Sequence, residues 1–326
     1  MIEARFYRQK EDKLECLLCP HHCLIAPGKI GLCRARKNEA GKLWAINYGR
    51  TVSVSVDPIE KKPLYHYYPG QPILSIAPNG CNMRCPFCQN WQIAQQPSPT
   101  EYISPENLLS LVKEHSIIGT SYTYTEPLIW FEYLVDAATL LKENGFKNVL
   151  VTNGMIEEGP LENLLPIIDA MNIDLKTMSP VKYKRILGGD LDVVKRTIEA
   201  SYRECHCEIT HLLVTGFNDT EEETGELVDY LKSIDPKIVL HLSRYFPHYK
   251  YKKDPTPQKT LERAYEIAKS RLKFVYLGNI TSDKGQTTVC PSCGKTVITR
   301  SFYQTKITGI ANGKCQKCGE DLNIKG

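Results

Sequence analysis

Short apolar segments alternate with amphipathic segments through the middle of the chain. The apolar segments are typical of strands, and they cover residues 73–77, 119–125, 148–152, 170–175, 208–214, 238–243 and 274–277. The stretches between them carry apolar residues at the spacing of one helix face. Strands that alternate with helices predict parallel strands joined by crossover helices.

Two of the intervening segments carry helix-boundary residues. In the segment 104–115, Ser104 is the expected N-cap and Pro105 lies in the first turn. The segment 128–144 is followed by Gly145, a residue that commonly ends helices. An open doubly wound sheet is one arrangement for such units, but no dinucleotide-binding fingerprint follows the first strand. We therefore expect an α/β fold with a partial (β/α)6 TIM-type barrel.

Polar residues gather at or near the ends of the expected strands. They are Thr123, Thr125, Glu126, Asn153, Asp174, Lys176, His211, His241 and Arg244. Ordinary structural roles exist for them: Glu126 as an acid at a helix start, Asp174 with Lys176 as a surface ion pair, and the histidines as core residues. In a barrel, however, catalytic and binding residues lie at the carboxyl ends of the strands. Their shared placement predicts one functional site.

Composition narrows the class of protein. A net charge of +4 over 326 residues is too mild for a dedicated nucleic-acid binder. The N-terminus lacks the apolar run of a secretory signal, and no stretch approaches the roughly 20 apolar residues that span a bilayer. Thirteen cysteines in this context indicate metal ligands in a reducing compartment rather than disulfides. We expect a soluble, cytoplasmic protein without membrane contact.

Three cysteines directly follow the first expected strand of the barrel, at a C-x3-C-x2-C spacing. They are Cys81, Cys85 and Cys88. A closed structural metal site takes four protein ligands, so a set of three leaves one metal position open. Three thiolates can hold a [4Fe–4S] cluster that keeps one iron for a small molecule. The alternative is a zinc site that a distant ligand completes.

A set of four cysteines precedes this loop. It consists of Cys16, Cys19, Cys23 and Cys33, and we call it the N-terminal quartet. Four thiolates suit one zinc ion or an auxiliary [4Fe–4S] cluster, and the spacing leaves both open. His21 and His22 lie among the four thiols and are expected to be loop residues, because four thiols already complete a site.

A second set of four cysteines lies near the C-terminus. It consists of Cys290, Cys293, Cys315 and Cys318, the C-terminal quartet, in two C-x2-C knuckles that are each followed by Gly. This pattern predicts a zinc ribbon, although a rubredoxin-like iron would satisfy the same geometry. The cysteine sets divide the chain into an N-terminal Cys-rich metal-binding segment (1–69), the barrel (70–280) and a C-terminal zinc-ribbon-like module (281–326).

Several segments match one known family. They are residues 16–23, 31–33, 79–91, 122–127, 172–176, 216–219, 241–247 and the C-terminal knuckles. The central body resembles radical S-adenosylmethionine (SAM) enzymes of the pyruvate formate-lyase activating-enzyme type. The whole chain is similar to the radical SAM enzyme of the AmmeMemoRadiSam system.

The resemblance implies roles for individual residues. Cys81, Cys85 and Cys88 would hold a [4Fe–4S] cluster that binds SAM, and Phe87 would lie beside the adenine. Thr123, Thr125 and Glu126 stand in the place of the family's Gly-Gly-Glu motif, whose carboxylate binds the methionyl amine. Asp174 and Lys176 match an Asp-Leu-Lys element near the SAM carboxylate. The further candidates for cofactor or substrate contacts are Asn153, His211, His241 and Arg244.

The chain departs from the family pattern at two places. Tyr124 and Thr125 replace the two glycines of the Gly-Gly-Glu motif, so only Glu126 is carried over from it directly. Val151 stands where activating enzymes have an Asp that helps to bind a monovalent cation. The resemblance therefore does not extend to that cation.

The function that the resemblance implies is reductive cleavage of SAM. An electron donor such as ferredoxin or flavodoxin would reduce the cluster, and a 5′-deoxyadenosyl radical would then abstract a hydrogen atom from an unidentified substrate. Memo-like and AMMECR1-like proteins are the partners that it suggests. The alternatives are a glycyl-radical-enzyme activase and a non-catalytic zinc-binding scaffold.

Overall fold

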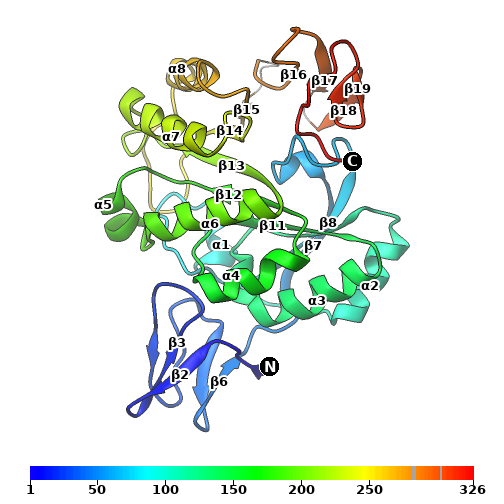
Figure 1. Cartoon of the computed structure of the whole chain (residues 1–326). Helices are drawn as coiled ribbons and strands as arrows, with labels where there is room; N and C mark the ends of the chain where they lie inside the picture. Colours follow the sequence, from blue (N-terminus) through cyan, green and yellow to red (C-terminus); the bar gives the residue numbers. More distant parts are fainter. Residues whose placement is uncertain (281–283, 302) are drawn as a thin grey trace. The chain divides into compact units, whose positions relative to one another are not determined.

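The computed structural model describes residues 1–280, 284–301 and 303–326 (Figure 1). The chain forms two compact units, and each contains separate stretches of sequence. The first unit consists of Met1–Val56, Ile73–Met171 and Ser179–His206, and the second of Asp57–Pro72, Asn172–Met178 and Cys207–Gly326. We describe each unit by itself. Residue 281, where the sequence places the start of the C-terminal module, lies outside the described residues.

A mainly parallel group of strands forms the centre of the first unit. In the order β11-β10-β8-β7-β9, the strands are β11 (Lys147–Thr152), β10 (Gly119–Tyr122), β8 (Pro72–Pro78), β7 (Arg50–Pro58) and β9 (Glu101–Tyr102). β9 pairs with β7 in antiparallel orientation. β10 pairs in parallel with β8 and with β11. The predicted strands at 73–77 and 148–152 are confirmed, and the strand predicted at 119–125 exists but ends at Tyr122. Their parallel pairing is confirmed as well. β12 (Ala170–Asp174) begins in this unit.

The helices of the first unit follow the boundary residues in the sequence. They are α1 (Trp91–Ala94), α2 (Pro105–Glu114), α3 (Phe131–Glu143), α4 (Glu158–Leu164), α5 (Pro180–Lys182) and α6 (Leu191–Glu204). Ser104 caps α2 by accepting a hydrogen bond from the Asn107 backbone N–H. A 3-10 turn, Pro127–Trp130, leads into α3, and the Glu126 side chain caps that turn. This polar residue is therefore fixed at the point where a buried helix begins.

Two small antiparallel sheets form the N-terminal part of the first unit, drawn in blue in Figure 1. The first sheet has the order β1-β6-β5 and consists of β1 (Ile2–Glu3), β6 (Lys42–Ala45) and β5 (Arg36–Glu39). The second sheet has the order β2-β3-β4 and consists of β2 (Tyr7–Lys10), β3 (Lys13–Cys16) and β4 (Leu24–Ile25). Arg36 and Glu132 of α3 form an ion pair of 2.8 Å, and both side chains are about 2% exposed. This buried pair fastens β5 to α3.

Parallel strands and two helices build the body of the second unit. The strand order is β15-β14-β13-β12, with β15 (Phe274–Gly278), β14 (Val239–Arg244) and β13 (His206–Leu213), and β14 pairs in parallel with both neighbours. The helices are α7 (Glu221–Ile234) and α8 (Gln258–Lys269). α8 packs on α7, β14 and β15. The predicted strands at 208–214, 238–243 and 274–277 are confirmed.

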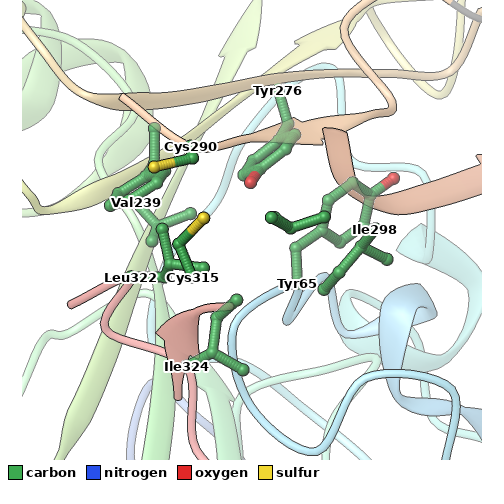
Figure 2. Packing of buried hydrophobic residues seen from close by; sticks show 10 residues of the cluster. Tyr65, Val239, Tyr276, Cys290, Ile298, Cys315, Leu322 and Ile324 are labelled. Atoms are coloured by element: carbon green, nitrogen blue, oxygen red, sulfur yellow. The ribbon is translucent and has the colours of Figure 1, made fainter. Parts of the chain in front are cut away.

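The C-terminal strands share a hydrophobic core with β14 and β15. The strands are β16 (Thr288–Val289), β17 (Thr296–Ser301), β18 (Gln304–Ile307), β19 (Ile310–Ala311) and β20 (Lys314–Cys315). The core cluster joins Tyr65, Val239 and Tyr276 to Ile298 and Leu322 (Figure 2). Burial of each large apolar side chain contributes about 1.5–3 kcal/mol. The C-terminal strands therefore do not depend on a metal site alone for stability.

Candidate functional site

The cysteine loop directly follows β8 and leads into the short helix α1. The Cys81 sulfur accepts a hydrogen bond of 3.3 Å from the Met83 backbone N–H, and the Asn153 side-chain amide lies 3.7 Å from it. Asn153 follows β11 and also donates to the Asn82 side chain at 2.8 Å. Cys85 and Cys88 form no disulfide. The ends of β8 and β11 thus bring Asn153 to the sulfur of Cys81.

Glu126 is hydrogen-bonded to the same asparagine, Asn153, that contacts Cys81. Its side chain is 1% exposed, and its Oε1 accepts hydrogen bonds from the Thr152 hydroxyl at 2.6 Å and the Leu128 N–H at 3.0 Å. Its Oε2 accepts a hydrogen bond of 2.8 Å from the Asn153 N–H. Donors from the end of β11 and from the 3-10 turn after Glu126 therefore hold this carboxylate in a fixed orientation.

Burial sets the acid–base behaviour of Cys81. Burial, and after it the nearby charge of Glu126, raise the pKa of the Cys81 thiol well above its ordinary value. Both effects penalise a thiolate that has no cation beside it. A metal centre bound to this sulfur would supply the missing positive charge. The pKa of Cys16 is likewise raised, to about 11, mainly by burial.

The residues that replace the two glycines keep a glycine-like backbone. Tyr124 has a φ of 64°, in the left-handed region that glycine adopts without strain. Its carbonyl accepts a hydrogen bond of 2.6 Å from the side chain of Asn90, next to the cysteine loop. Thr125 donates to the Pro78 carbonyl at 2.6 Å, and Thr123 is buried. The turn between β10 and Glu126 is therefore fastened to β8 and to the loop. Phe87 is buried as well.

The sequence candidates in the second unit form local contacts of their own. Lys176 and Asp174 form an ion pair of 3.0 Å. His211 is fully buried and donates from Nδ1 to the Leu175 carbonyl at 2.7 Å, and burial lowers its pKa. The Asn218 amide lies 3.4 Å from the other ring nitrogen of His211. His211 is therefore a neutral ring held between protein groups.

His241 belongs to a buried polar network. Its Nε2 donates to the Glu208 carboxylate at 2.6 Å, and His241 is only 3% exposed. Glu208 also accepts hydrogen bonds from the backbone N–H groups of Tyr65 and His66, at 2.9 and 2.7 Å. Arg244 donates to the Thr256 carbonyl at 2.7 Å. These contacts account for His241 and Arg244 without a ligand.

The N-terminal quartet lines a cavity. All four cysteines line it, together with Leu18, Ile25 and Arg36. Cys16 ends β3, Cys19 and Cys23 lie between β3 and β4, and Cys33 precedes β5. The two nearby histidines have other partners: His21 contacts the Asn82 carbonyl at 2.6 Å, and His22 contacts Glu157 at 2.9 Å.

The C-terminal quartet is compact. All four sulfurs lie within 4.8 Å of one another. The Cys290–Cys318 and Cys293–Cys315 sulfur pairs are 3.5 and 3.7 Å apart. A metal with bonds of about 2.3 Å to four tetrahedral thiolates separates them by about 3.8 Å. Gly294 and Gly319, with φ of 71° and 76°, make the turn after each knuckle. The four thiols can therefore bind one metal ion.

Comparison with known proteins decides the family. The sequence model of the Radical SAM superfamily matches residues 75–231, a range that includes the cysteine loop, Glu126 and Asn153. An uncharacterized protein of Methanocaldococcus jannaschii is 39% identical over 99% of both chains. The chain belongs to the radical SAM superfamily. It is thus an iron–sulfur, SAM-binding enzyme.

Other relatives of this radical SAM protein bear named activities. A pyruvate formate-lyase-activating enzyme of Clostridium pasteurianum is 27% identical over 48% of this chain and 67% of its own. A probable GTP 3′,8-cyclase of Methanococcus vannielii is 28% identical over 53% of this chain and 58% of its own. The solved structure of Streptococcus suis SuiB bound to S-adenosylmethionine gives a TM-score of 0.50 at 17% identity, covering 65% of this chain and 50% of that chain. That likeness is one of fold.

The sequence analysis did not identify the residues that hydrogen-bond to the predicted site residues and to Tyr124. Asn82, Asn90 and Thr152 hold Asn153, Tyr124 and Glu126 in place. Asn82 lies in the cysteine loop and Asn90 follows it. Their position beside the cysteines is the only feature of the sequence that could have indicated this role. Among the described residues, no helix is long and apolar enough to cross a membrane.

Proposed function

We propose that Cys81, Cys85 and Cys88 hold the [4Fe–4S] cluster of this radical SAM enzyme and that Glu126 binds the ammonium group of SAM. The proposal rests on the joint placement of Cys81, Asn153 and Glu126. The Asn153 side chain donates to the Cys81 sulfur, and the Asn153 backbone N–H donates to Glu126. A carboxylate fixed beside the cluster position suits a cationic amine.

The residues of the loop fit such a cluster. None of the three cysteines forms a disulfide, and among the described residues their sulfurs are not part of a compact group like the C-terminal quartet. The Met83 N–H and the Asn153 amide both point to the Cys81 sulfur, and hydrogen bonds to sulfur adjust the potential of iron–sulfur centres. When bound, the cluster supplies the electron that cleaves SAM to methionine and a 5′-deoxyadenosyl radical, which takes a hydrogen atom from the substrate.

The chain's own residues orient SAM and exclude water. Thr123, Thr125 and the turn at Tyr124 place Glu126, and the buried ring of Phe87 offers an apolar surface for the adenine. We assign Lys176, with Asp174, to the SAM carboxylate on the strength of the Asp-Leu-Lys resemblance. Because His211 and His241 are buried and already bonded to protein groups, we give them a structural role in place of a ligand contact.

The remaining proposals concern architecture and partners. The strands and helices support a partial barrel. The sulfur spacing of the C-terminal quartet supports one tetrahedral metal ion, and we propose zinc because structural four-thiolate sites usually hold zinc. The similarity to an activating enzyme keeps a glycyl-radical activase as the second candidate. Memo-like and AMMECR1-like proteins, from the full-length resemblance, are the first partners to test, with ferredoxin or flavodoxin as electron donor.

Anaerobic spectroscopy tests the proposal. Reduced wild-type protein should give an S = 1/2 EPR signal that changes shape when SAM is added. Cys81→Ala should lose the signal that responds to SAM, whereas Cys205→Ala, which changes a thiol outside all three cysteine sets, should keep it. A SAM-responsive signal that survives in Cys81→Ala would refute the assignment. A stable glycyl radical on a co-encoded protein after incubation would favour the activase.

A further inference from the structure

The three cysteine sets of this chain differ in how closely their thiols approach. The C-terminal quartet brings all its sulfurs within 4.8 Å of one another. Among the described residues no other group of three or more metal-binding side chains does so, and the described residues include every cysteine of the chain. The N-terminal quartet is therefore less compact than the C-terminal quartet.

The spacing distinguishes two kinds of metal centre. One zinc ion draws four thiolates to about 3.8 Å from one another. A cubane cluster binds each thiolate through a different iron atom, so the sulfurs stand apart and the inorganic core needs a cavity between them. The N-terminal quartet fits the second kind, because its four cysteines, all among the described residues, line one pocket and no three of their sulfurs lie within 4.8 Å of one another.

The rest of the cavity wall suits a cluster. Apart from the thiols, it is mainly apolar, from Leu18, Ile25, Leu128, Ile129 and Met155. Arg36 also lines it, and Glu132 holds this guanidinium in a buried ion pair. An apolar wall limits the access of water to a centre held by four thiolates. On these grounds we propose that Cys16, Cys19, Cys23 and Cys33 hold a second [4Fe–4S] cluster.

This second site adjoins the loop of the first. At Gly80, just before Cys81, an added Cβ would lie 2.5 Å from the Cys33 carbonyl oxygen. Asn82 lines the cavity, and its neighbour in sequence is Cys81. Arg34 donates to the carbonyls of Gln95 and Ala94 at the end of α1, and Arg84 donates to the Leu32 carbonyl. The two cysteine sets are therefore neighbours within the first unit.

The proposal deepens the proposed function, and metal analysis tests the two separately. In anaerobically reconstituted full-length protein, wild type should contain about eight iron and eight sulfide ions per chain. The variant Cys81→Ala/Cys85→Ala/Cys88→Ala should retain about four of each, and Cys16→Ser/Cys19→Ser should also contain about four. Cys205→Ala is the matched control and should equal wild type.

Each outcome decides a different assignment. If the triple variant contains no iron and more than one zinc ion per chain, the second cluster is wrong. If instead Cys16→Ser/Cys19→Ser is the variant without iron, the proposed site at Cys81 is wrong while the second cluster stands. Should Cys16→Ser/Cys19→Ser not fold, the triple variant still decides, because its N-terminal quartet is intact. In reduced wild type, coupling between neighbouring clusters should broaden the EPR signal relative to the triple variant, and equal line widths would contradict the adjoining position.

Discussion

Replacing Glu126 with Gln separates the charge of this residue from its shape. The substitution removes the negative charge that we assign to the ammonium group of SAM. A hydrogen bond to a charged group is worth about 1.5–3 kcal/mol, so SAM should bind about 10- to 140-fold more weakly. We expect this loss in protein that holds its clusters, measured by equilibrium dialysis with labelled SAM under anaerobic conditions.

The same substitution has a cost to stability that the structure specifies. Glu126 Oε2 accepts a hydrogen bond from the Asn153 N–H at 2.8 Å, and Oε1 already accepts two others. An amide NH2 at the Oε2 position would set a donor against a donor in a buried place, at a cost of about 1–3 kcal/mol in the free energy of unfolding. A lower Tm should therefore accompany the weaker SAM binding.

Thr152→Val is the control that keeps the charge. It removes the hydroxyl that donates to Glu126 Oε1 at 2.6 Å, and it should lower the free energy of unfolding by about 0.5–1.5 kcal/mol. SAM affinity should fall much less than in Glu126→Gln. If both variants lose SAM affinity in proportion to their loss of stability, Glu126 acts only as a cap for the turn before α3, and the assigned contact with SAM is incorrect.

Three further substitutions test other parts of the structure. Gly80→Ala places a Cβ 2.5 Å from the Cys33 carbonyl oxygen, at a residue whose φ is 123°. It should destabilise the first unit by more than about 2 kcal/mol in chemical denaturation and lower the iron content. Gly41→Ala, which has open space around it, should destabilise the protein less. Cys290→Ser/Cys293→Ser should abolish zinc and leave iron unchanged by elemental analysis; zinc retained in full would contradict the C-terminal site. Glu208→Ala should lower the free energy of unfolding by about 3–5 kcal/mol, because His241 and two backbone N–H groups lose their buried acceptor. A Tm equal to that of wild type would contradict this and show that water replaces the carboxylate.

The alternation of apolar and amphipathic segments predicts β8 and β10 to β15 of the central strands, but it does not indicate β7 (Arg50–Pro58). The predicted strand 73–77 is β8 (Pro72–Pro78), and the helix expected at 104–115 is α2 with the predicted cap. These elements are recognisable because each carries its own period or boundary residue. The strands of the N-terminal sheets span only two to four residues, which is too short for a hydrophobic period to appear, so sequence patterns do not predict them.

The individual residues of the candidate site are predictable from the sequence, whereas the contacts between them are not. The cysteine spacing and the carboxylate at Glu126 follow from chemistry that the sequence displays. The partners of His241 do not, because Glu208 and the backbone of Tyr65 and His66 come from separate stretches of the chain. The left-handed Tyr124 is also invisible in sequence, since a tyrosine gives no sign of a positive φ. Contacts between distant segments are decided by packing, which local patterns do not report.

Release of 5′-deoxyadenosine from SAM is the most direct test of the central claim. Reduced, reconstituted wild-type protein should form 5′-deoxyadenosine and methionine in equal amounts, measured by chromatography after a fixed time. Cys81→Ala should form neither above the level of a protein-free control, and Cys205→Ala should match wild type. Equal 5′-deoxyadenosine from wild type and Cys81→Ala would contradict the assignment of the Cys81–Cys88 loop as the SAM-cleaving centre.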